Sequence, residues 1–293
     1  MGRISDALKR AGANEKEPGQ PTFVSPWAVA GEAASASIRT AASARPLFRE
    51  IETTPFRGFN PEYRDRLVVS SDNLPLVESF RNLGGTLNAA QKERDIKIVL
   101  ITSAIPDDGK TLTAMNLALT MSESYGRNVL LIDADLRRPT LHKIAGIGDT
   151  EGLSEGLRSQ FEKKLTVCEL GPMLKLLPAG RAEADPISLL SSGRMRQIVE
   201  EAAGAFDYVI LDAPPVAMMS DTTVLSTVVD AVLLVIRAGR TPCALAQKTI
   251  QLIGEDRILG VVLNGASESD FSQYGYAYPK AGYGPAENDP GRK

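Results

Sequence analysis

Short, mostly apolar runs recur through the central and C-terminal parts of the chain, and each ends at a polar or small residue. Runs this short are typical of strands that are covered on both faces of a sheet. They lie at Ile98–Ile101, Val129–Ile132, Leu174–Leu177, Tyr208–Leu211, Ala231–Ile236 and Ile258–Leu263.

Longer segments with a helical spacing of apolar residues lie between these runs. They are predicted at Pro75–Gln91, Thr111–Ser124, a helical region that extends to Gly156, Gly193–Ala203, Thr222–Val228 and Cys243–Ile253. Regular alternation of strands and helices indicates parallel strands with helices packed on both faces of the sheet. The predicted fold class is therefore α/β, with a doubly wound, mainly parallel sheet and helices on both faces.

The ends of the chain differ from this central part. Residues 1–70 are predicted to form an N-terminal amphipathic segment and flexible linker, disordered or extended, because Pro/Gly and Ala/Ser-rich stretches follow a short apolar stripe. This stripe could dock on a partner or membrane surface, or fold against the domain. Residues 71–266 are predicted to form the folded domain, and residues 267–293 a flexible tyrosine-rich tail.

Composition and charge exclude several classes of function. The chain has 293 residues, is 43% hydrophobic and carries a net charge of −3, which gives no reason to expect nucleic-acid binding. No run approaches the ~20 apolar residues of a membrane-spanning helix, and we expect no signal peptide. The single histidine, His142, argues against a zinc site or a Ser-His-Asp hydrolase, and the two distant cysteines indicate structural thiols in a reducing compartment.

The first chemical motif follows the strand at residues 98–101. Ala104–Thr111 reads Ala-Ile-Pro-Asp-Asp-Gly-Lys-Thr and opens a helix. Such a loop presents backbone N–H groups and a helix N-terminus to phosphates, with Lys110 on the β/γ-phosphates and Thr111 on magnesium. We expect Asp107 and Asp108 to point outward, because two carboxylates beside a triphosphate would repel it. A Gly-Lys-Thr sequence alone could equally be a helix start without a ligand.

Two further strands end in acidic residues. Asp133 and Asp135 follow the strand at residues 129–132 and share a side by alternation, and Asp212 follows the strand at residues 208–211. The carboxyl ends of parallel strands are where such sheets bind ligands. Acids that face a phosphate imply a cation, most simply Mg²⁺. The alternative is that these aspartates only cap the helices that follow.

The combined motifs resemble the bacterial tyrosine autokinases, or BY-kinases, of capsular and exopolysaccharide biosynthesis, which belong to the deviant P-loop ATPase group. The resemblance runs from about Leu76 to Tyr283. It rests on a phosphate loop with proline before Gly-Lys-Thr, an Asp-x-Asp-x-Arg motif at Asp133–Arg137, and Asp-Ala-Pro-Pro at Asp212–Pro215.

The resemblance implies ATP and Mg²⁺ as cofactors and a role for each site residue. The implied catalytic residues are Lys110, Asp133, Asp135 and Arg137. The implied nucleotide-binding residues are Pro106, Asp107, Asp108, Gly109, Lys110, Thr111, Leu112 and Asn264, and Thr111, Asp133 and Asp212 would hold the metal. Either aspartate of the Asp-x-Asp pair would orient the incoming tyrosine hydroxyl and take its proton.

A tyrosine cluster near the C-terminus fits the same resemblance. Four of the seven tyrosines, Tyr274, Tyr276, Tyr278 and Tyr283, lie among glycine, alanine and proline residues. Such a segment cannot build a core. The family phosphorylates a cluster of this kind, so these four residues are the implied phospho-acceptors. A plain sticky tail is the alternative interpretation.

The resemblance also implies partners. The chain would act with a separate membrane polysaccharide co-polymerase that activates it, a cognate tyrosine phosphatase and further copies of itself. It would be cytoplasmic and peripheral at the inner face of the plasma membrane. The family's self-association motif, Glu-x-x-Arg-x-x-Arg, is incomplete, because Gly84 follows Glu78 and Arg81 in place of the second arginine.

Two other classes of protein remain alternatives. Partitioning and positioning ATPases of the same group are non-kinase switches, but they carry an additional lysine where this chain has Ile105. A binding module with a decayed site is the third interpretation, and the intact lysine, threonine and three aspartates argue against it.

Overall fold

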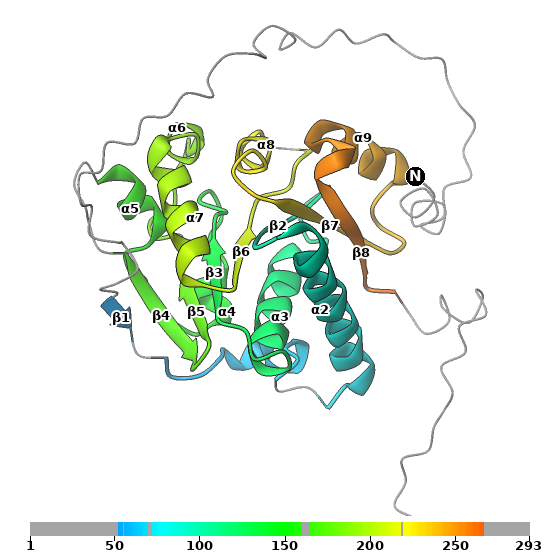
Figure 1. The fold of residues 1–293 in the computed structure, drawn as a ribbon, viewed down its shortest axis with the longest axis horizontal. Helices are drawn as coiled ribbons and strands as arrows, with labels where there is room; N and C mark the ends of the chain where they lie inside the picture. The colour runs from blue at the N-terminus through cyan, green and yellow to red at the C-terminus, as the bar shows by residue number, and fades with distance from the viewer. Residues whose placement is uncertain (1–51, 55, 70–71, 160–164, 218, 267–293) are drawn as a thin grey trace, which may run out of the picture.

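The computed structural model describes residues 52–54, 56–69, 72–159, 165–217 and 219–266 (Figure 1). The predicted N-terminal stripe and the tyrosine tail lie outside these residues. The described part forms one α/β layer structure, in which a sheet separates two sets of helices.

The sheet confirms the predicted fold class. Its strand order is β1-β4-β5-β3-β6-β2-β7-β8. The strands are β1 (Glu52–Thr54), β2 (Ile98–Ser103), β3 (Val129–Asp133), β4 (Thr166–Gly171), β5 (Leu174–Leu177), β6 (Tyr208–Asp212), β7 (Ala231–Arg237) and β8 (Ile258–Asn264). Along this order, each strand from β5 onward is parallel to the next one, through β3, β6, β2 and β7 to β8. Strand β4 pairs antiparallel with β5 and parallel with β1. The sequence pattern predicted neither β1 nor β4.

The main helices also lie where the sequence predicts them, with two differences. The helical elements are η1 (Pro61–Arg66), α2 (Leu74–Arg94), α3 (Lys110–Glu123), α4 (Leu141–Ile144), α5 (Leu153–Arg158), α6 (Ile187–Leu190), α7 (Gly193–Ala205), α8 (Asp221–Leu225), α9 (Cys243–Ile253) and η2 (Glu255–Arg257). The region expected to be helical up to Gly156 contains two short helices, α4 and α5. The helix expected at Thr222–Val228 ends at Leu225, and hydrogen-bonded turns follow it.

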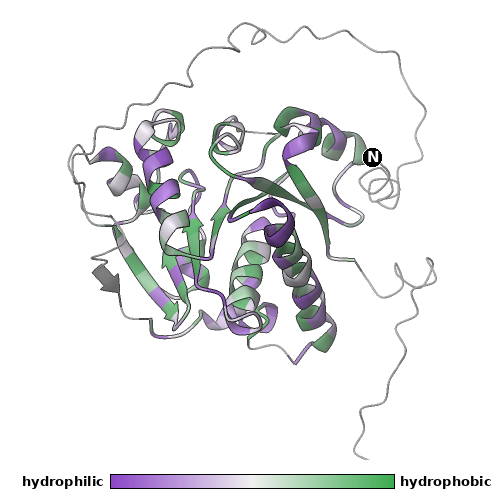
Figure 2. Ribbon diagram, in the orientation of Figure 1, coloured by the Kyte–Doolittle hydropathy of each residue, from purple (hydrophilic) through white to green (hydrophobic). Residues whose placement is uncertain are grey.

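Alternation along the strands divides the core into two clusters. In β2, Ile98 and Leu100 pack with α5 to α9, whereas Val99 and Ile101 pack with α2, α3 and α4. Each strand residue therefore contributes to one face only, as the two-residue period of a strand requires. Figure 2 shows the mostly hydrophobic central strands between helices of mixed hydropathy.

Residues 56–69, which the sequence pattern assigned to the linker, pack against the α3 face. Leu67 is fully buried there. The side chain of Asn116 on α3 holds the same segment, because it accepts a hydrogen bond from the Val68 N–H at 3.0 Å and donates one to the Arg66 carbonyl at 2.8 Å. This stretch is therefore part of the domain rather than a linker, because a buried leucine and a satisfied buried amide fix it to the core.

Helix α2 runs unbroken through the adjacent Gly84 and Gly85. The ring of Tyr125, just after α3, lies against these glycines, and its hydroxyl donates to the Arg81 carbonyl at 2.7 Å. A Cβ on Gly84 would lie 2.8 Å from the Tyr125 ring and 3.2 Å from the Met121 sulfur. Gly84 therefore permits close packing between α2 and α3, at a position that faces inward.

Replacing Gly84 by arginine, which restores the family pattern, is expected to destabilise the domain. Overpacking against Tyr125 should lower the free energy of unfolding by about 1–3 kcal/mol. Gly204 in α7 is the control, because a Cβ there meets nothing within 4 Å. Gly204→Ala should raise stability by about 0.5 kcal/mol. Denaturant unfolding of both variants measures this, and a Gly84→Arg protein as stable as the wild type would contradict the packing described.

Candidate functional site: a phosphate loop facing buried carboxylates

The phosphate loop connects β2 to α3 in a tight left-handed turn. Gly109 caps α3 with φ of 96°, and Asp107 has φ of 64°. A Cβ on Gly109 would lie 1.9 Å from the Asn264 side-chain nitrogen, so only glycine fits there. Helix α3 begins at Lys110, directly after this glycine. The backbone N–H groups of its N-terminus therefore lie at the loop, which is the arrangement that binds phosphate.

The two aspartates of the loop point in different directions. The Asp107 side chain is 79% exposed and lies 3.4 Å from the Arg240 guanidinium. Asp108 is fully buried and accepts a hydrogen bond from the Thr241 hydroxyl at 2.8 Å. The expectation that both carboxylates point outward is wrong for Asp108. Burial raises the pKa of Asp108, and its hydrogen bonds to Thr241 and the Ile105 N–H oppose that rise.

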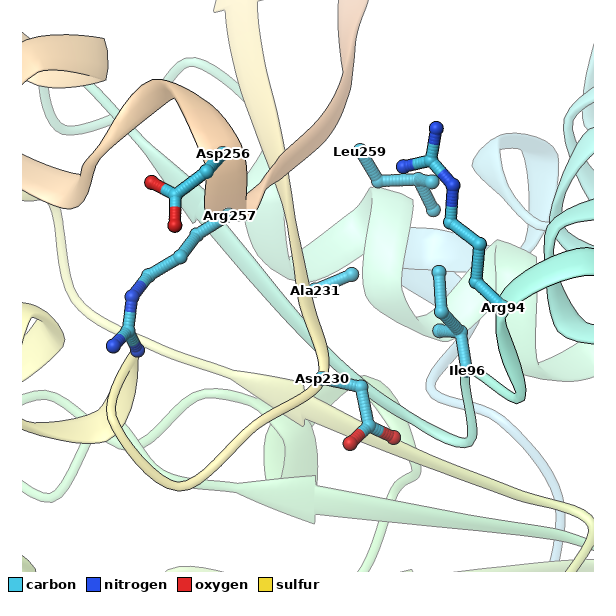
Figure 3. Close-up of a pocket in the computed structure, with 7 residues that line it drawn as sticks. All are labelled: Arg94, Ile96, Asp230, Ala231, Asp256, Arg257 and Leu259. Carbon is cyan, nitrogen blue, oxygen red and sulfur yellow. The ribbon is translucent and has the colours of Figure 1, made fainter.

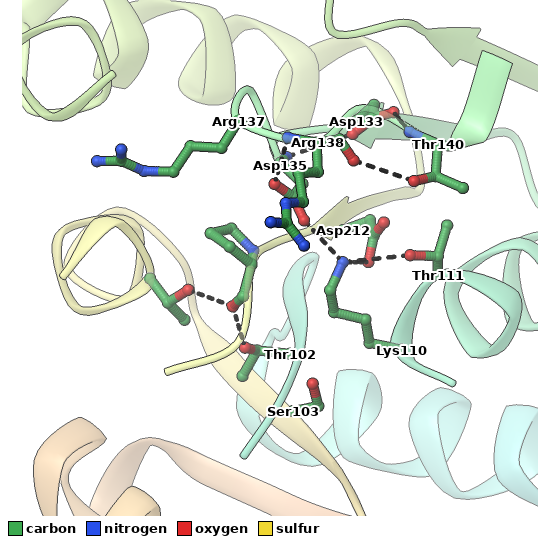
Figure 4. A network of polar contacts seen from close by, with 12 residues as sticks. Thr102, Ser103, Lys110, Thr111, Asp133, Asp135, Arg137, Arg138, Thr140 and Asp212 are labelled. Carbon is green, nitrogen blue, oxygen red and sulfur yellow. Dashed lines mark hydrogen bonds and ion pairs between the residues drawn. The ribbon is translucent and has the colours of Figure 1, made fainter. Parts of the chain in front are cut away.

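Lys110 meets the acidic motifs at the carboxyl ends of the central strands (Figure 4). Its ammonium lies 3.0 Å from Asp135 Oδ2 and 3.6 Å from Asp212 Oδ1, and it donates to the Thr111 hydroxyl at 3.2 Å. The structure therefore brings together the lysine, the threonine and the acids that the sequence predicted. Burial opposes the charge of Lys110, but the attraction of Asp212 and Asp135 outweighs it, and the pKa of Lys110 is raised.

Asp133 is fully buried and fully engaged by backbone groups. Its carboxylate accepts hydrogen bonds from the N–H groups of Asp135, Thr140 and Leu141. Burial, and then repulsion from Asp212 on the neighbouring strand, raise the pKa of Asp133 to about 7. Asp133 thus holds the turn into α4, which is the capping role that the sequence left as an alternative.

Asp212 is also buried, but its oxygens have no hydrogen-bond partner. Its contact with Lys110, at 3.6 Å, is an ion pair too long for a hydrogen bond. Burial raises the pKa of Asp212 to about 6, and the charge of Lys110 limits the rise. A buried carboxylate with unused oxygens beside the Thr111 hydroxyl fits a hard cation such as Mg²⁺. Within the described residues no set of three or more acidic, histidine or cysteine side chains forms a metal cage, so phosphate and water oxygens would complete such a site.

Asp212 sits on a firmly held segment. The hydroxyls of Thr102 in β2 and Thr222 in α8 both donate to the Pro214 carbonyl, at 2.7 and 2.6 Å (Figure 4). These two bonds tie the proline loop to the adjacent strand and to the helix that follows.

Arg137 does not reach the phosphate side of the site. Its guanidinium forms a two-point ion pair with Asp221, with Nε 2.6 Å from Oδ2 and Nη2 3.1 Å from Oδ1, and it also donates to the Ala184 carbonyl. In Figure 4 its side chain extends away from Lys110. Asp221 is fully buried, and no sequence motif identifies it. Arg137 thus joins the Asp-x-Asp loop to α8 and to the loop before α6.

Asn264, at the end of β8, lies at the phosphate loop. Its side-chain amide donates to the Asp108 carbonyl at 2.8 Å. The remaining predicted nucleotide-binding residues belong to the loop or to the first turn of α3, and all lie in the described part of the chain. The predicted acceptors Tyr274, Tyr276, Tyr278 and Tyr283 lie outside it.

A separate cavity of about 260 Å³ lies near the opposite ends of the strands (Figure 3). Its lining includes Arg94 before β2, Asp230 before β7 and Arg257 before β8. The Asp230 carboxylate already accepts hydrogen bonds from the Lys97 and Ile98 N–H groups, both at 2.8 Å. The cavity is thus remote from the phosphate loop. It lies among the side chains at the amino ends of β2, β7 and β8.

The fold and site together define a P-loop nucleotide-binding protein, and comparison with known proteins supports this class. A family model described as ParA, NUBPL iron-transfer P-loop NTPase, matches residues 96–270. Among curated proteins, the chain is 37% identical over 203 residues to the tyrosine-protein kinase YwqD of Bacillus subtilis, covering 68% of this chain and 85% of YwqD. It is 30% identical to the tyrosine-protein kinase CpsD of Streptococcus agalactiae, covering 68% and 89% of the two chains.

Solved structures agree. The kinase domain of the Escherichia coli tyrosine kinase ETK superposes with a TM-score of 0.63 at 34% identity, covering 67% of this chain and 79% of that domain. The chain belongs to the bacterial tyrosine-kinase family of P-loop proteins. It spans only 29% of the full-length E. coli etk protein and 28% of the Rhizobium meliloti succinoglycan biosynthesis transport protein ExoP. None of the helices in the described ranges has the length and apolar character to cross a membrane.

The ion pair between Arg137 and Asp221 is expected to stabilise the domain. Arg137→Met would leave a buried carboxylate without its partner and should cost about 3 kcal/mol of unfolding free energy. Combining it with Asp221→Asn should recover part of that loss, because the charge is removed as well. Denaturant unfolding of the two single variants and the double variant measures the coupling. Additive losses would show that the pair contributes nothing beyond its separate side chains.

Proposed function

We propose that this protein is an ATP-dependent tyrosine kinase that phosphorylates its own C-terminal tyrosine cluster and so regulates polysaccharide polymerisation and export. The observation that carries the proposal is the placement of Lys110 at a helix N-terminus, between Asp135 and Asp212. Membership of the tyrosine-kinase family and the presence of Tyr274, Tyr276, Tyr278 and Tyr283 in the tail support the choice of acceptor.

In this proposal the phosphate loop binds the β- and γ-phosphates of ATP through backbone N–H groups from Asp107 to Thr111. Lys110 neutralises the charge that develops on the transferred phosphoryl group. Thr111 and Asp212 would hold Mg²⁺, with Asp133 beside them, and the metal would screen the phosphate charges. Pro106 stiffens the start of the loop, and Leu112 contributes the first turn of α3.

The tyrosine oxygen forms the new bond to the γ-phosphorus while the bond from that phosphorus to the β,γ-bridging oxygen breaks. ADP leaves with the bonding electrons, and the phenolic proton passes to a carboxylate. Asp135 suits this role better than Asp133. Three backbone N–H groups engage Asp133, whereas Asp135 accepts one, from Arg138, and lies next to Lys110, which also faces the phosphate loop. Tyrosine has an ordinary pKa of about 10, so positioning of the hydroxyl matters more than prior deprotonation.

Arg137 would act indirectly, by fixing the Asp-x-Asp loop against Asp221. Asn264 would support the loop from β8 and lie next to the adenine. The acceptor tail would come from a neighbouring copy of the chain in a homo-oligomer. A membrane co-polymerase would activate the protein at the inner face of the plasma membrane, and a cognate phosphatase would reverse the modification. The similarity to ExoP, named a succinoglycan biosynthesis transport protein, supports the export setting.

A non-kinase switch ATPase of the partitioning type is the second candidate. The match to a ParA family model favours it. The inward-facing Gly84, which replaces an arginine of the self-association motif, also favours it, because it argues against assembly through that motif.

The autokinase proposal predicts phosphate on the tail after incubation with ATP and magnesium. Lys110→Met should reduce tyrosine phosphorylation to below about one-hundredth of the wild-type level, because phosphoryl charge is no longer neutralised. Lys248→Met, which removes an exposed lysine on α9, is the matched control and should leave phosphorylation unchanged. Intact-mass and phosphopeptide analysis measure the result. ATP hydrolysis with unmodified tyrosines, even with a genuine partner present, would support the switch ATPase instead.

The partner proposal predicts that the isolated protein is a weak kinase. Adding the cytoplasmic segment of its co-polymerase should raise the initial rate of autophosphorylation by about tenfold, as expected for allosteric coupling of ordinary size. A scrambled segment of the same composition is the control. Full activity of the purified protein alone would contradict the need for an activator.

A further inference from the structure

The buried Asp108 connects the phosphate loop to a distant part of the chain. Its carboxylate accepts the Thr241 hydroxyl hydrogen at 2.8 Å, and Thr241 lies in the loop between β7 and α9. The Thr241 oxygen in turn accepts a hydrogen bond from the Arg237 N–H at 2.9 Å. Asp108 is fully buried and Thr241 is 6% exposed, so this connection is sheltered from water.

Two further contacts hold the same loop, and they come from the carboxyl ends of β7 and β8. Asn264 donates to the Asp108 carbonyl at 2.8 Å, and the Arg237 guanidinium donates to the Asp107 carbonyl at 3.3 Å. Asp107 and Gly109, on either side of Asp108, both have positive φ angles. Backbone in this conformation persists when surrounding contacts determine it. The last residues of β7 and β8, together with Thr241 in the loop after β7, supply contacts of that kind here.

We propose that Thr241 is a positioning residue for nucleotide binding, because its bond to Asp108 holds the phosphate loop in its binding conformation. The proposal rests on nucleotide binding at this loop and does not depend on which group accepts the phosphate. Losing the hydroxyl would leave a buried carboxylate oxygen without its partner, which is more disruptive than losing a bond that water can replace. The loop would then relax away from the geometry that directs its N–H groups at phosphate.

Thr241→Val tests this with a side chain of nearly the same shape. We expect the dissociation constant for ADP with magnesium, measured by isothermal titration calorimetry, to rise by about tenfold or more. Thr241→Ser keeps the hydroxyl and should bind ADP within about twofold of the wild type. The matched control is Thr249→Val in α9. Thr249 is 1% exposed, but its hydroxyl bonds only to the Leu245 carbonyl of its own helix. This variant should also stay within about twofold.

A double variant separates positioning from a general loss of stability. If Thr241 acts through Asp108, then Thr241→Val combined with Asp108→Ala should bind ADP no more weakly than Asp108→Ala alone. Thermal unfolding without nucleotide, measured in parallel, identifies any variant that has lost the fold.

The outcomes are distinguishable. A Thr241→Val protein that is folded and binds ADP like the wild type overturns the proposal. So does a loss of affinity that Thr249→Val shares, or one that Thr241→Ser fails to restore. Wild-type protein that binds no ADP would overturn both this proposal and the proposed function. ADP binding without any tyrosine phosphorylation would contradict the kinase proposal alone.

Discussion

The structure depends on three buried carboxylates that share one lysine. Asp133, Asp135 and Asp212 all lie at the carboxyl ends of neighbouring strands with at most 5% exposure, and Lys110 pairs directly with only two of them. Buried charge is costly unless it is paired or hydrogen-bonded. Asp133 meets that condition through backbone N–H groups, whereas Asp212 retains unused oxygens. Because the Asp212 oxygens have no hydrogen-bond donors to offset their burial, Asp212 is the member of the cluster best suited to bind a cation.

The loops around this cluster are held in place by side-chain bonds to neighbouring elements of the fold. Arg137 fixes the Asp-x-Asp loop to Asp221, and two threonine hydroxyls fix the proline loop at Pro214. Thr241 does the same for the phosphate loop through Asp108. A site for phosphoryl transfer acts mainly through positioning and electrostatics. In the proposed kinase, these polar bonds would therefore contribute by holding the motif residues in position.

Packing between α2 and α3 connects the phosphate loop to the self-association motif. The motif residues Glu78 and Arg81 lie on α2, and α3 packs against this helix. Helix α3 starts at the phosphate loop, and the Tyr125 ring just beyond its end rests on Gly84 of α2. Glu78 and Arg81 form an exposed ion pair on the same helix, at 2.6 Å. The third position of that motif, Gly84, is thus buried between α2 and α3 and does not lie at the surface. Any assembly of this protein through α2 would need contacts other than a second arginine at position 84.

The sequence by itself determined the central strands, the main helices and the convergence of Lys110 with the acidic motifs. It could do so because apolar runs mark buried strands, and parallel strands bring their carboxyl ends to one edge. Only the tertiary structure decided the antiparallel β4, the packing of residues 56–69, the inward turn of Asp108 and the true partner of Arg137. Asp221 is 84 residues from Arg137, and Thr241 is 133 residues from Asp108. Such pairs depend on strand order and loop path, which a local pattern of residues does not specify.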